Sequence, residues 1–160
     1  VVLDPLMVST SGRALLAQTA VSTLCKELFP LATLITPNLP EAEALTGRRL
    51  TTEADCETAA MELEATYGCA VLVKGGHASA GANDLLCENG KIVWFYGERV
   101  ETQNTHGTGC TLSSAIACEL ADGLCLTDAV RRAKAYLTGA LKAGLDLGHG
   151  NGPLNHFYER

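Results

Sequence analysis

The residues of this chain best suited to chemistry lie in the run Asn104-Thr105-His106-Gly107-Thr108-Gly109-Cys110, which leads into a stretch of small residues. Its two glycines lack a Cβ, so the main chain there can approach a ligand closely. The small residues favour a helix, whose first amides have no intrahelical partner and carry the positive end of the helix dipole. The run predicts either an anion site suited to phosphate or a tight loop before a helix.

Cys110 stands where this helix is predicted to start. A helix N-terminus favours the thiolate form of cysteine, so Cys110 could accept a proton beside a phosphoryl group. The other six of the seven cysteines show no Cys-x-x-Cys spacing, and most lie in apolar runs. We expect them to be small core residues in a reducing cytoplasm, not disulfide or zinc partners. They are Cys25, Cys56, Cys69, Cys87, Cys118 and Cys125.

Two charged residues follow predicted buried strands. Asp4 comes after the apolar residues 1–3, and Lys74 comes after the apolar residues 69–73. Ligands of open α/β sheets bind at the carboxyl ends of the strands. Asp4 is therefore either a site residue or a turn residue. Lys74, beside Gly75, either leans over phosphates or is a solvated lysine in a turn.

Asn38 and Glu41 follow another short predicted strand, residues 32–35. Their spacing favours a helix cap, in which each side chain bonds the other residue's amide. The same two oxygen-bearing side chains could instead hold a hydrated Mg²⁺. Pro40 fits the first turn of the helix and Gly47 fits its end.

The remaining pattern predicts helices alternating with strands, and then a hairpin. Asn89-Gly90 is a strong hairpin signal between strands at 84–87 and 91–95, and a further short strand is expected at 99–101. Together these elements predict an α/β fold with a mostly parallel sheet and an antiparallel hairpin edge. Helices are expected from residue 11 or 12 to 29, over 53–67, from Cys110 to 122 and over 127–145.

Composition excludes several classes of protein. The chain has 160 residues, 47% of them apolar and 19% charged, which suits a single globular domain over residues 1–160. A net charge of −6 without a basic cluster disfavours nucleic-acid binding. We expect no membrane association, because apolar runs long enough to span a bilayer are absent from the sequence. The chain opens on an apolar strand without an initiator Met, which suggests a fragment.

Taken together, five segments resemble the hydroxymethylpyrimidine/phosphomethylpyrimidine kinases of thiamine biosynthesis, in the ribokinase superfamily. The resemblance spans essentially the whole chain and keeps the order and spacing of the motifs. The segments are Asp4-Pro5-Leu6-Met7-Val8, Ile35-Thr36-Pro37-Asn38-Leu39-Pro40-Glu41-Ala42-Glu43, Val73-Lys74-Gly75-Gly76-His77, the run from Thr105 to Ser113, and Gly150-Asn151-Gly152-Pro153.

This resemblance implies a ribokinase-like three-layer sandwich. It also implies ATP- and Mg²⁺-dependent phosphorylation of 4-amino-5-hydroxymethyl-2-methylpyrimidine and of its monophosphate. By this resemblance, Gly107, Thr108, Gly109 and Cys110 match the family's anion hole. Cys110 also falls at the position of the general base. Asn38, Lys74, Thr105, Lys134 and Leu137 match the nucleotide-binding positions. Glu41 is implied to contact Mg²⁺ indirectly, and Asp4, Leu6 and Met7 are implied to lie near the pyrimidine, with Leu6 where the family usually has Val.

The same resemblance indicates that the N-terminal half of such kinases is missing from this sequence. The chain would then carry the nucleotide and phosphoryl-transfer portion, and it would associate through an exposed sheet edge or as a homodimer. Two alternatives remain: a pyridoxine or pyridoxal kinase of the same superfamily, or a non-catalytic nucleotide-binding fragment.

Overall fold

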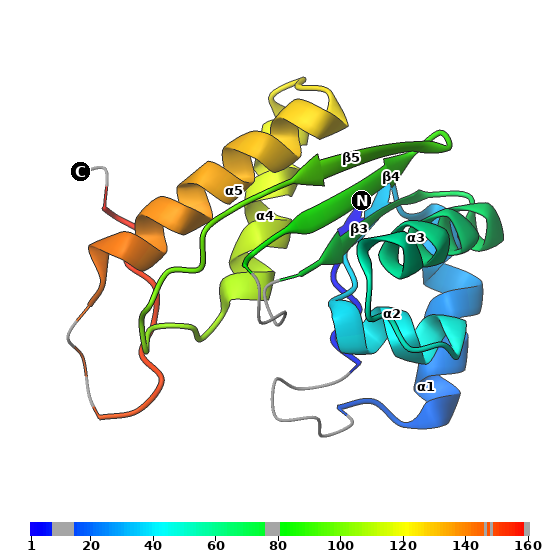
Figure 1. Ribbon diagram of the computed structural model, residues 1–160, viewed down its shortest axis with the longest axis horizontal. Helices are drawn as coiled ribbons and strands as arrows, with labels where there is room; N and C mark the ends of the chain where they lie inside the picture. Colours follow the sequence, from blue (N-terminus) through cyan, green and yellow to red (C-terminus); the bar gives the residue numbers. More distant parts are fainter. Residues whose placement is uncertain (8–14, 76–80, 146, 148, 159–160) are drawn as a thin grey trace. The chain divides into compact units, whose positions relative to one another are not determined.

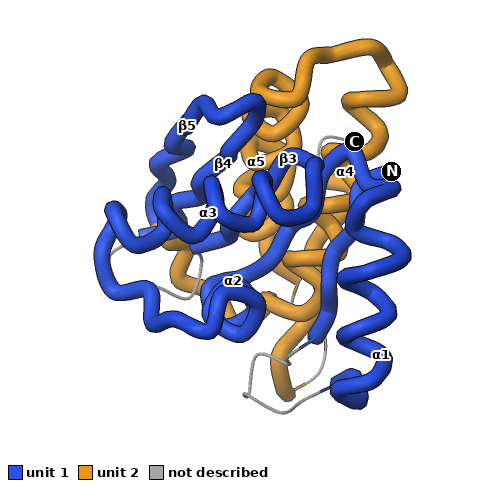
Figure 2. Tube along the Cα trace, turned by 90° about the vertical axis from the view of Figure 1, so that its right-hand side faces the viewer, with its two compact units in different colours: residues 1–98 blue, residues 99–160 orange. Residues whose placement is uncertain are grey.

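The computed structural model describes residues 1–7, 15–75, 81–145, 147 and 149–158. The chain forms two compact units, residues 1–98 and 99–160 (Figure 2). The assignment of residues 1–160 to a single domain stays a prediction. Val8, Gly76 and His77 of the sequence motifs lie outside the described residues.

The first unit is built on a five-stranded sheet in the order β1-β2-β3-β4-β5 (Figure 1). β1, β2 and β3 are parallel, with Leu3 opposite Ile35 and Ile35 opposite Val71. β4 and β5 continue the sheet as an antiparallel hairpin, so the predicted α/β class and hairpin edge are confirmed. The strands are β1 (Val2–Leu3), β2 (Leu34–Ile35), β3 (Ala70–Lys74), β4 (Asp84–Glu88) and β5 (Lys91–Phe95).

The hairpin turn follows from its two central residues. Asn89 has φ 52° and Gly90 has φ 70°. Two left-handed residues in a two-residue loop match the right-handed twist of the flanking strands. The hairpin also contacts the neighbouring helix, because the buried Cys87 thiol donates a hydrogen bond to Glu64 over 3.2 Å. Burial, and then this hydrogen bond, raises the pKa of Cys87 to about 12.

Two helices of this unit begin with reciprocal caps. α2 (Leu39–Thr46) starts at Asn38 and ends at Gly47, which has φ 69°. α3 (Glu53–Tyr67) starts at Thr52, has the predicted bounds, and ends at a left-handed Gly68. Capping side chains satisfy amides that have no intrahelical partner, which is why these short polar residues mark the starts.

The first predicted helix differs from the expectation. It begins at Gln18 instead of residue 11 or 12; residues 15–17 are not helical, and residues 11–14 lie outside the described part. The Leu15 amide bonds the Met7 carbonyl over 2.9 Å, which draws this stretch away from helical geometry. α1 (Gln18–Thr23) then passes into a π-helical turn, Leu24–Leu28, and a 3₁₀ turn, Phe29–Leu31. The helix α1 itself buries no residue.

The core of the first unit lies between the sheet and helices α2 and α3. Ile35, Val71 and Leu85 project from three neighbouring strands into this core, where they meet Ala60 and Leu63 of α3. Alternate strand residues point to the opposite face, and Leu34, Leu72 and Leu86 are also fully buried there. The strands therefore read as continuous apolar runs.

The second unit is a helical pair. α4 (Thr108–Ala121) and α5 (Leu126–Ala143) pack together, and each has buried residues, among them Ile116 on α4 and Val130 and Ala133 on α5. The helix predicted from Cys110 begins two residues earlier, at Thr108, because Gly107 adopts the left-handed cap. The prediction of a strand at residues 99–101 is wrong, since these residues are not in a strand and pair with none of the described strands.

All seven cysteines are free. Cys69 and Cys87 are buried and Cys25 and Cys56 are half-buried, but Cys118 and Cys125 are exposed, so the core expectation is wrong for the last two. Cys118 lies on α4, and Cys125 directly precedes α5. In the described part of the chain, every helix is too short or too polar to cross a bilayer.

The cap of α3 predicts a pH dependence of stability. Hydrogen bonds from the Thr51 and Thr52 amides and hydroxyls lower the pKa of Asp55 from 3.8 to about 2. Ionised Asp55 thus stabilises the fold above about pH 4, and this contribution disappears as the pH falls through 2. In urea unfolding, the stability gap between wild type and Asp55→Asn should be constant above pH 5 and shrink from pH 4 to 2. Glu53→Gln removes a carboxylate from the same turn but leaves the cap intact. Its stability difference from wild type should therefore not show the change between pH 4 and 2. A gap that does not vary with pH would contradict the prediction.

Candidate functional site

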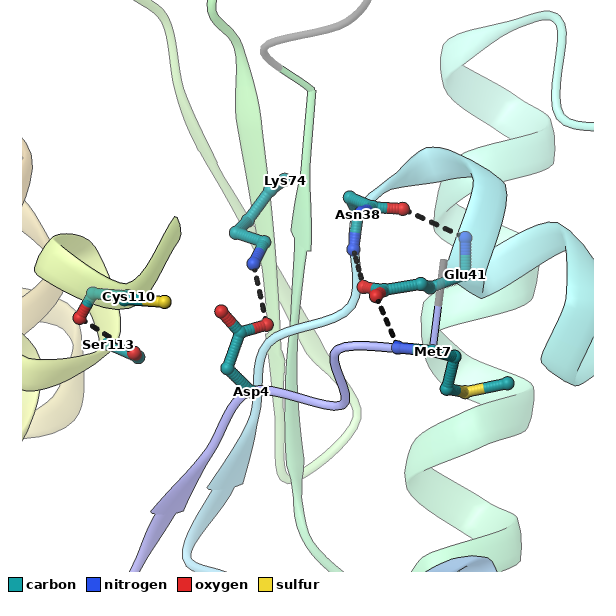
Figure 3. A network of polar contacts seen from close by, with 7 residues as sticks. All are labelled: Asp4, Met7, Asn38, Glu41, Lys74, Cys110 and Ser113. Carbon is teal, nitrogen blue, oxygen red and sulfur yellow. Dashed lines mark hydrogen bonds and ion pairs between the residues drawn. The ribbon is translucent and has the colours of Figure 1, made fainter. Parts of the chain in front are cut away.

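Polar residues collect at the carboxyl ends of the three parallel strands (Figure 3). Asp4 follows β1, Asn38 lies three residues after β2, and Lys74 ends β3. Asn38 and Lys74 form a parallel bridge, in which the Lys74 amide bonds the Pro37 carbonyl over 2.8 Å. The structure therefore brings together these predicted site residues of the first unit.

Lys74 and Asp4 form a buried ion pair. The Lys74 Nζ lies 2.8 Å from the Asp4 Oδ1, and the two side chains are 13% and 8% exposed. Lys74 is therefore not a solvated turn lysine, and Asp4 is more than a turn residue. Neither charge would be stable so far from water without the other.

Two buried oxygens at this pair have no hydrogen-bond partner in the part of the chain that the structure describes. They are the Asp4 Oδ2 and the Thr36 hydroxyl. Because Leu3 pairs with Ile35, the next residues, Asp4 and Thr36, leave adjacent parallel strands side by side. Sequence reasoning missed Thr36, although it directly follows a strand as Asp4 does. Unpaired buried oxygens are costly, and they are suited to a hard cation or ordered water.

Asn38 and Glu41 form the predicted cap. The Glu41 amide donates to the Asn38 Oδ1, and the Asn38 amide donates to the Glu41 Oε2, each over 2.9 Å. The cap interpretation is confirmed, and Glu41 is almost completely buried. Its other oxygen, Oε1, accepts the Met7 amide over 2.9 Å, a contact between residues 34 positions apart. The proposed link of Glu41 to Mg²⁺ stays a prediction.

Leu6 and Met7 differ in exposure although they are neighbours. The Leu6 side chain is 48% exposed, whereas Met7 is buried. Leu6 also adopts a left-handed conformation, with φ 48°, which is rare for a residue with a Cβ. The loop after β1 therefore presents Leu6 outward and anchors Met7 inward.

Gly75 is required by the close approach of another strand. A Cβ at this position would overlap the carbonyl oxygen of Asn83. The Gly75 amide donates to the buried Asp84 carboxylate over 3.0 Å. A larger residue would push the segment after Lys74 away from β4.

In the second unit, Gly107, Thr108, Gly109 and Cys110 form the turn and the first residues of α4. Gly107 is the cap, with φ 82°, and no side chain caps this helix start. The amides of the next three residues thus have the orientation of an anion site. Cys110 is exposed on this first turn, and its carbonyl accepts the Ser113 hydroxyl over 3.1 Å (Figure 3).

The segment before the glycine turn is braced by the C-terminal residues. The His106 amide bonds the Gly152 carbonyl over 3.3 Å, and the Asn104 side chain bonds the Leu145 carbonyl over 2.8 Å. Thr105, between them, is exposed. Sequence reasoning gave no role to Asn104, and local spacing could not have found this long-range brace.

Cys110 also lines a cavity within the second unit. The cavity has a volume of about 740 Å³, and Ser114, Tyr136 and His156 are among its lining residues. The Tyr136 hydroxyl donates to the His156 carbonyl over 3.1 Å. Lys134 and Leu137, the predicted nucleotide residues on α5, are half-buried.

The buried pair predicts a large effect of removing one charge. Lys74→Met leaves the Asp4 carboxylate buried without a cation, so it should lower the free energy of unfolding by about 3 kcal/mol. The double variant Asp4→Asn/Lys74→Met should lose much less. Urea unfolding measures both, with the exposed Lys91→Met as the control. If Lys74→Met were no more destabilising than Lys91→Met, the pair would contribute nothing to the fold.

Comparisons with known proteins identify the family of this chain. The sequence profile described as phosphomethylpyrimidine kinase matches residues 1–155. A relative named hydroxymethylpyrimidine/phosphomethylpyrimidine kinase, from Rhizobium meliloti, is 49% identical over 98% of this chain and 60% of its own length. This chain therefore spans about three fifths of the length of that relative.

Solved structures agree in fold. The phosphomethylpyrimidine kinase of Clostridium difficile is 39% identical, with a TM-score of 0.75 over 88% of this chain and 56% of its own. The pyridoxal kinase of Staphylococcus aureus, solved in complex with ADP, is 31% identical, with a TM-score of 0.89 over 99% of this chain and 58% of its own. From the profile match over nearly its whole length, the chain belongs to the phosphomethylpyrimidine kinase family.

Proposed function

We propose that the chain carries the nucleotide and phosphoryl-transfer portion of a kinase of thiamine biosynthesis. The reaction is ATP-dependent phosphorylation of 4-amino-5-hydroxymethyl-2-methylpyrimidine and then of its monophosphate. The observation that carries the proposal is the first turn of α4, where uncapped amides and the exposed Cys110 thiol share one helix end.

The glycine turn supports the role of an anion hole. Amides of Thr108, Gly109 and Cys110 would donate to the γ-phosphoryl oxygens as negative charge spreads over them. Such donors are already oriented before the reaction, so they stabilise the transition state without a cost of reorientation. Phosphoryl transfer depends mainly on this kind of positioning and charge stabilisation.

Cys110 would act as the general base. Its thiolate takes the proton of the substrate hydroxyl while that oxygen bonds to the γ-phosphorus and the bond to the ADP oxygen breaks. The products are the phosphate ester, ADP and the protonated thiol. The exposure of Cys110 and its place on the cavity are compatible with this role.

Residues of the first unit would bind the two substrates. Lys74 supplies a point charge for the nucleotide phosphates, and its pairing with Asp4 holds the ammonium in place. Asn38 lies beside it at the same sheet edge. Asp4, Leu6 and Met7 are assigned to the pyrimidine, and Thr105, Lys134 and Leu137 to the nucleotide.

The residues present fit Mg²⁺ at this edge. Asp4 offers an oxygen without a partner, and Thr36 offers another. The described residues contain no cluster of three His, Cys, Asp or Glu side chains, which suits a cation that keeps much of its water. Glu41 would contribute only through water, because both its oxygens already accept amides. When bound, Mg²⁺ neutralises phosphate charge.

We further propose a cytoplasmic enzyme that associates through its sheet edge. Free cysteines suit a reducing compartment. Among the described residues of the first unit, β1 pairs only with β2, so its other edge has main-chain groups that a second chain, such as a copy of this one, could pair with.

Replacing the base tests the mechanism. Cys110→Ala should lower kcat by about a hundred- to ten-thousand-fold, because a positioned proton acceptor is lost. Turnover is measured by coupling ADP release to a detectable reaction. Cys125→Ala removes an exposed thiol from the same unit, away from the cavity that Cys110 lines, and should leave kcat unchanged. Undiminished turnover in Cys110→Ala would remove the base role.

A pyridoxal kinase is the second candidate, favoured by the high TM-score to the Staphylococcus aureus enzyme. Rates on the pyrimidine and on pyridoxal, measured side by side, should favour the pyrimidine. Phosphorylation of pyridoxal alone would overturn the thiamine assignment. Calorimetry with Mg-ATP tests the remaining alternative, a non-catalytic nucleotide-binding fragment. Binding of Mg-ATP without turnover of either substrate would indicate such a fragment.

A further inference from the structure

We propose that Glu41 is a positioning residue that holds the loop Asp4–Met7 against the start of α2. By fixing that loop, it sets the position of Leu6, which the proposed function assigns to the pyrimidine. That Glu41 fixes the loop is argued only from its hydrogen bonds to the Met7 and Asn38 amides. The consequence for the substrate rests on the proposed function.

The carboxylate of Glu41 joins two separate segments. Its Oε1 accepts the Met7 amide and its Oε2 accepts the Asn38 amide, both over 2.9 Å (Figure 3). Glu41 is 1% exposed, so these bonds form away from water, where charge-assisted hydrogen bonds are strong. The second bond belongs to the cap of α2, but the first has no part in capping. Glutamine has only one acceptor oxygen and could not serve both amides.

The loop needs an external hold because of Leu6. A left-handed φ of 48° is unfavourable for a residue with a Cβ, and the half-exposed Leu6 side chain cannot offset that cost by burial. The hold comes from the next residue. Met7 is buried, its amide bonds Glu41, and its carbonyl accepts the Leu15 amide over 2.9 Å.

A direct role for Glu41 as a Mg²⁺ ligand predicts different behaviour. Both of its oxygens already accept an amide, and the unpartnered oxygens of this edge belong to Asp4 and Thr36. A positioning role, with at most a water-mediated contact to the cation, therefore predicts a smaller change in Mg²⁺ dependence than in the pyrimidine KM when Glu41 is altered. A ligand role predicts a large change.

Amide hydrogen exchange tests the hold in the 160-residue chain. Glu41→Gln should speed exchange of the Met7 amide at least tenfold, while the Thr36 amide, which bonds the Leu3 carbonyl between β1 and β2, changes less than twofold. Glu43→Gln is the matched control, because Glu43 lies on the same helix and its carboxylate also accepts a main-chain amide, that of Leu50. It should leave both rates unchanged. Unaltered Met7 exchange in Glu41→Gln, or equal acceleration of Met7 and Thr36, would overturn the proposal.

Kinetics test the consequence for the substrate. Glu41→Gln should raise the pyrimidine KM about tenfold and change the ATP KM less than threefold. The Mg²⁺ half-saturation, which includes the proposed water-mediated contact, should shift less than the pyrimidine KM. A merely structural role would move all three together, and a ligand role would move the Mg²⁺ value most; either result would overturn the positioning role.

Two further outcomes keep the test decisive. If Glu41→Gln does not fold, hydrogen exchange of the Met7 amide in the wild-type chain provides the test. Protection above about a hundredfold supports the proposed bond to Glu41, and exchange at the rate of an unstructured peptide overturns it. If the wild-type chain shows no turnover, the proposed function fails for this chain, whereas Met7 exchange still decides the hold.

Discussion

A buried ion pair connects two strands that are not neighbours in the sheet. Asp4 follows β1 and Lys74 ends β3, so their contact passes across the end of β2, which lies between them. Removing either charge would leave the other without a partner in a poorly solvated place, so the two strand ends are constrained together. The rest of the site in the first unit is arranged around this constraint.

Charges at this edge are stabilised in two different ways. Lys74 and Asp4 neutralise each other as side chains, whereas Glu41 is stabilised by main-chain amides and by the N-terminus of α2. The first arrangement leaves one carboxylate oxygen, the Asp4 Oδ2, without a partner, and the second uses both oxygens of its carboxylate. This difference is why we propose that Asp4, and not Glu41, has an oxygen available to Mg²⁺, and that Glu41 is a positioning residue.

The start of α4 in the second unit presents positive charge without a charged side chain. Gly107 turns the chain into α4, and the amides that follow offer partial positive charge from the main chain. Asn104 and His106 are tied to the C-terminal residues, which restricts the loop that leads into the turn. The anion hole proposed for this turn depends on fixed main-chain geometry, so bracing from distant residues would be part of it.

Local features of this protein were determined by the sequence alone. The Asn89-Gly90 turn, the cap at Asn38 and the glycine before α4 depend on residues a few positions apart, and each was predictable for that reason. Tertiary structure alone decided which charges met. It paired Lys74 with Asp4 over 70 positions, aimed Glu41 at Met7, and shortened the first helix through the bond from Leu15 to Met7. Such contacts join segments that only the packed sheet brings together, and no local spacing encodes them.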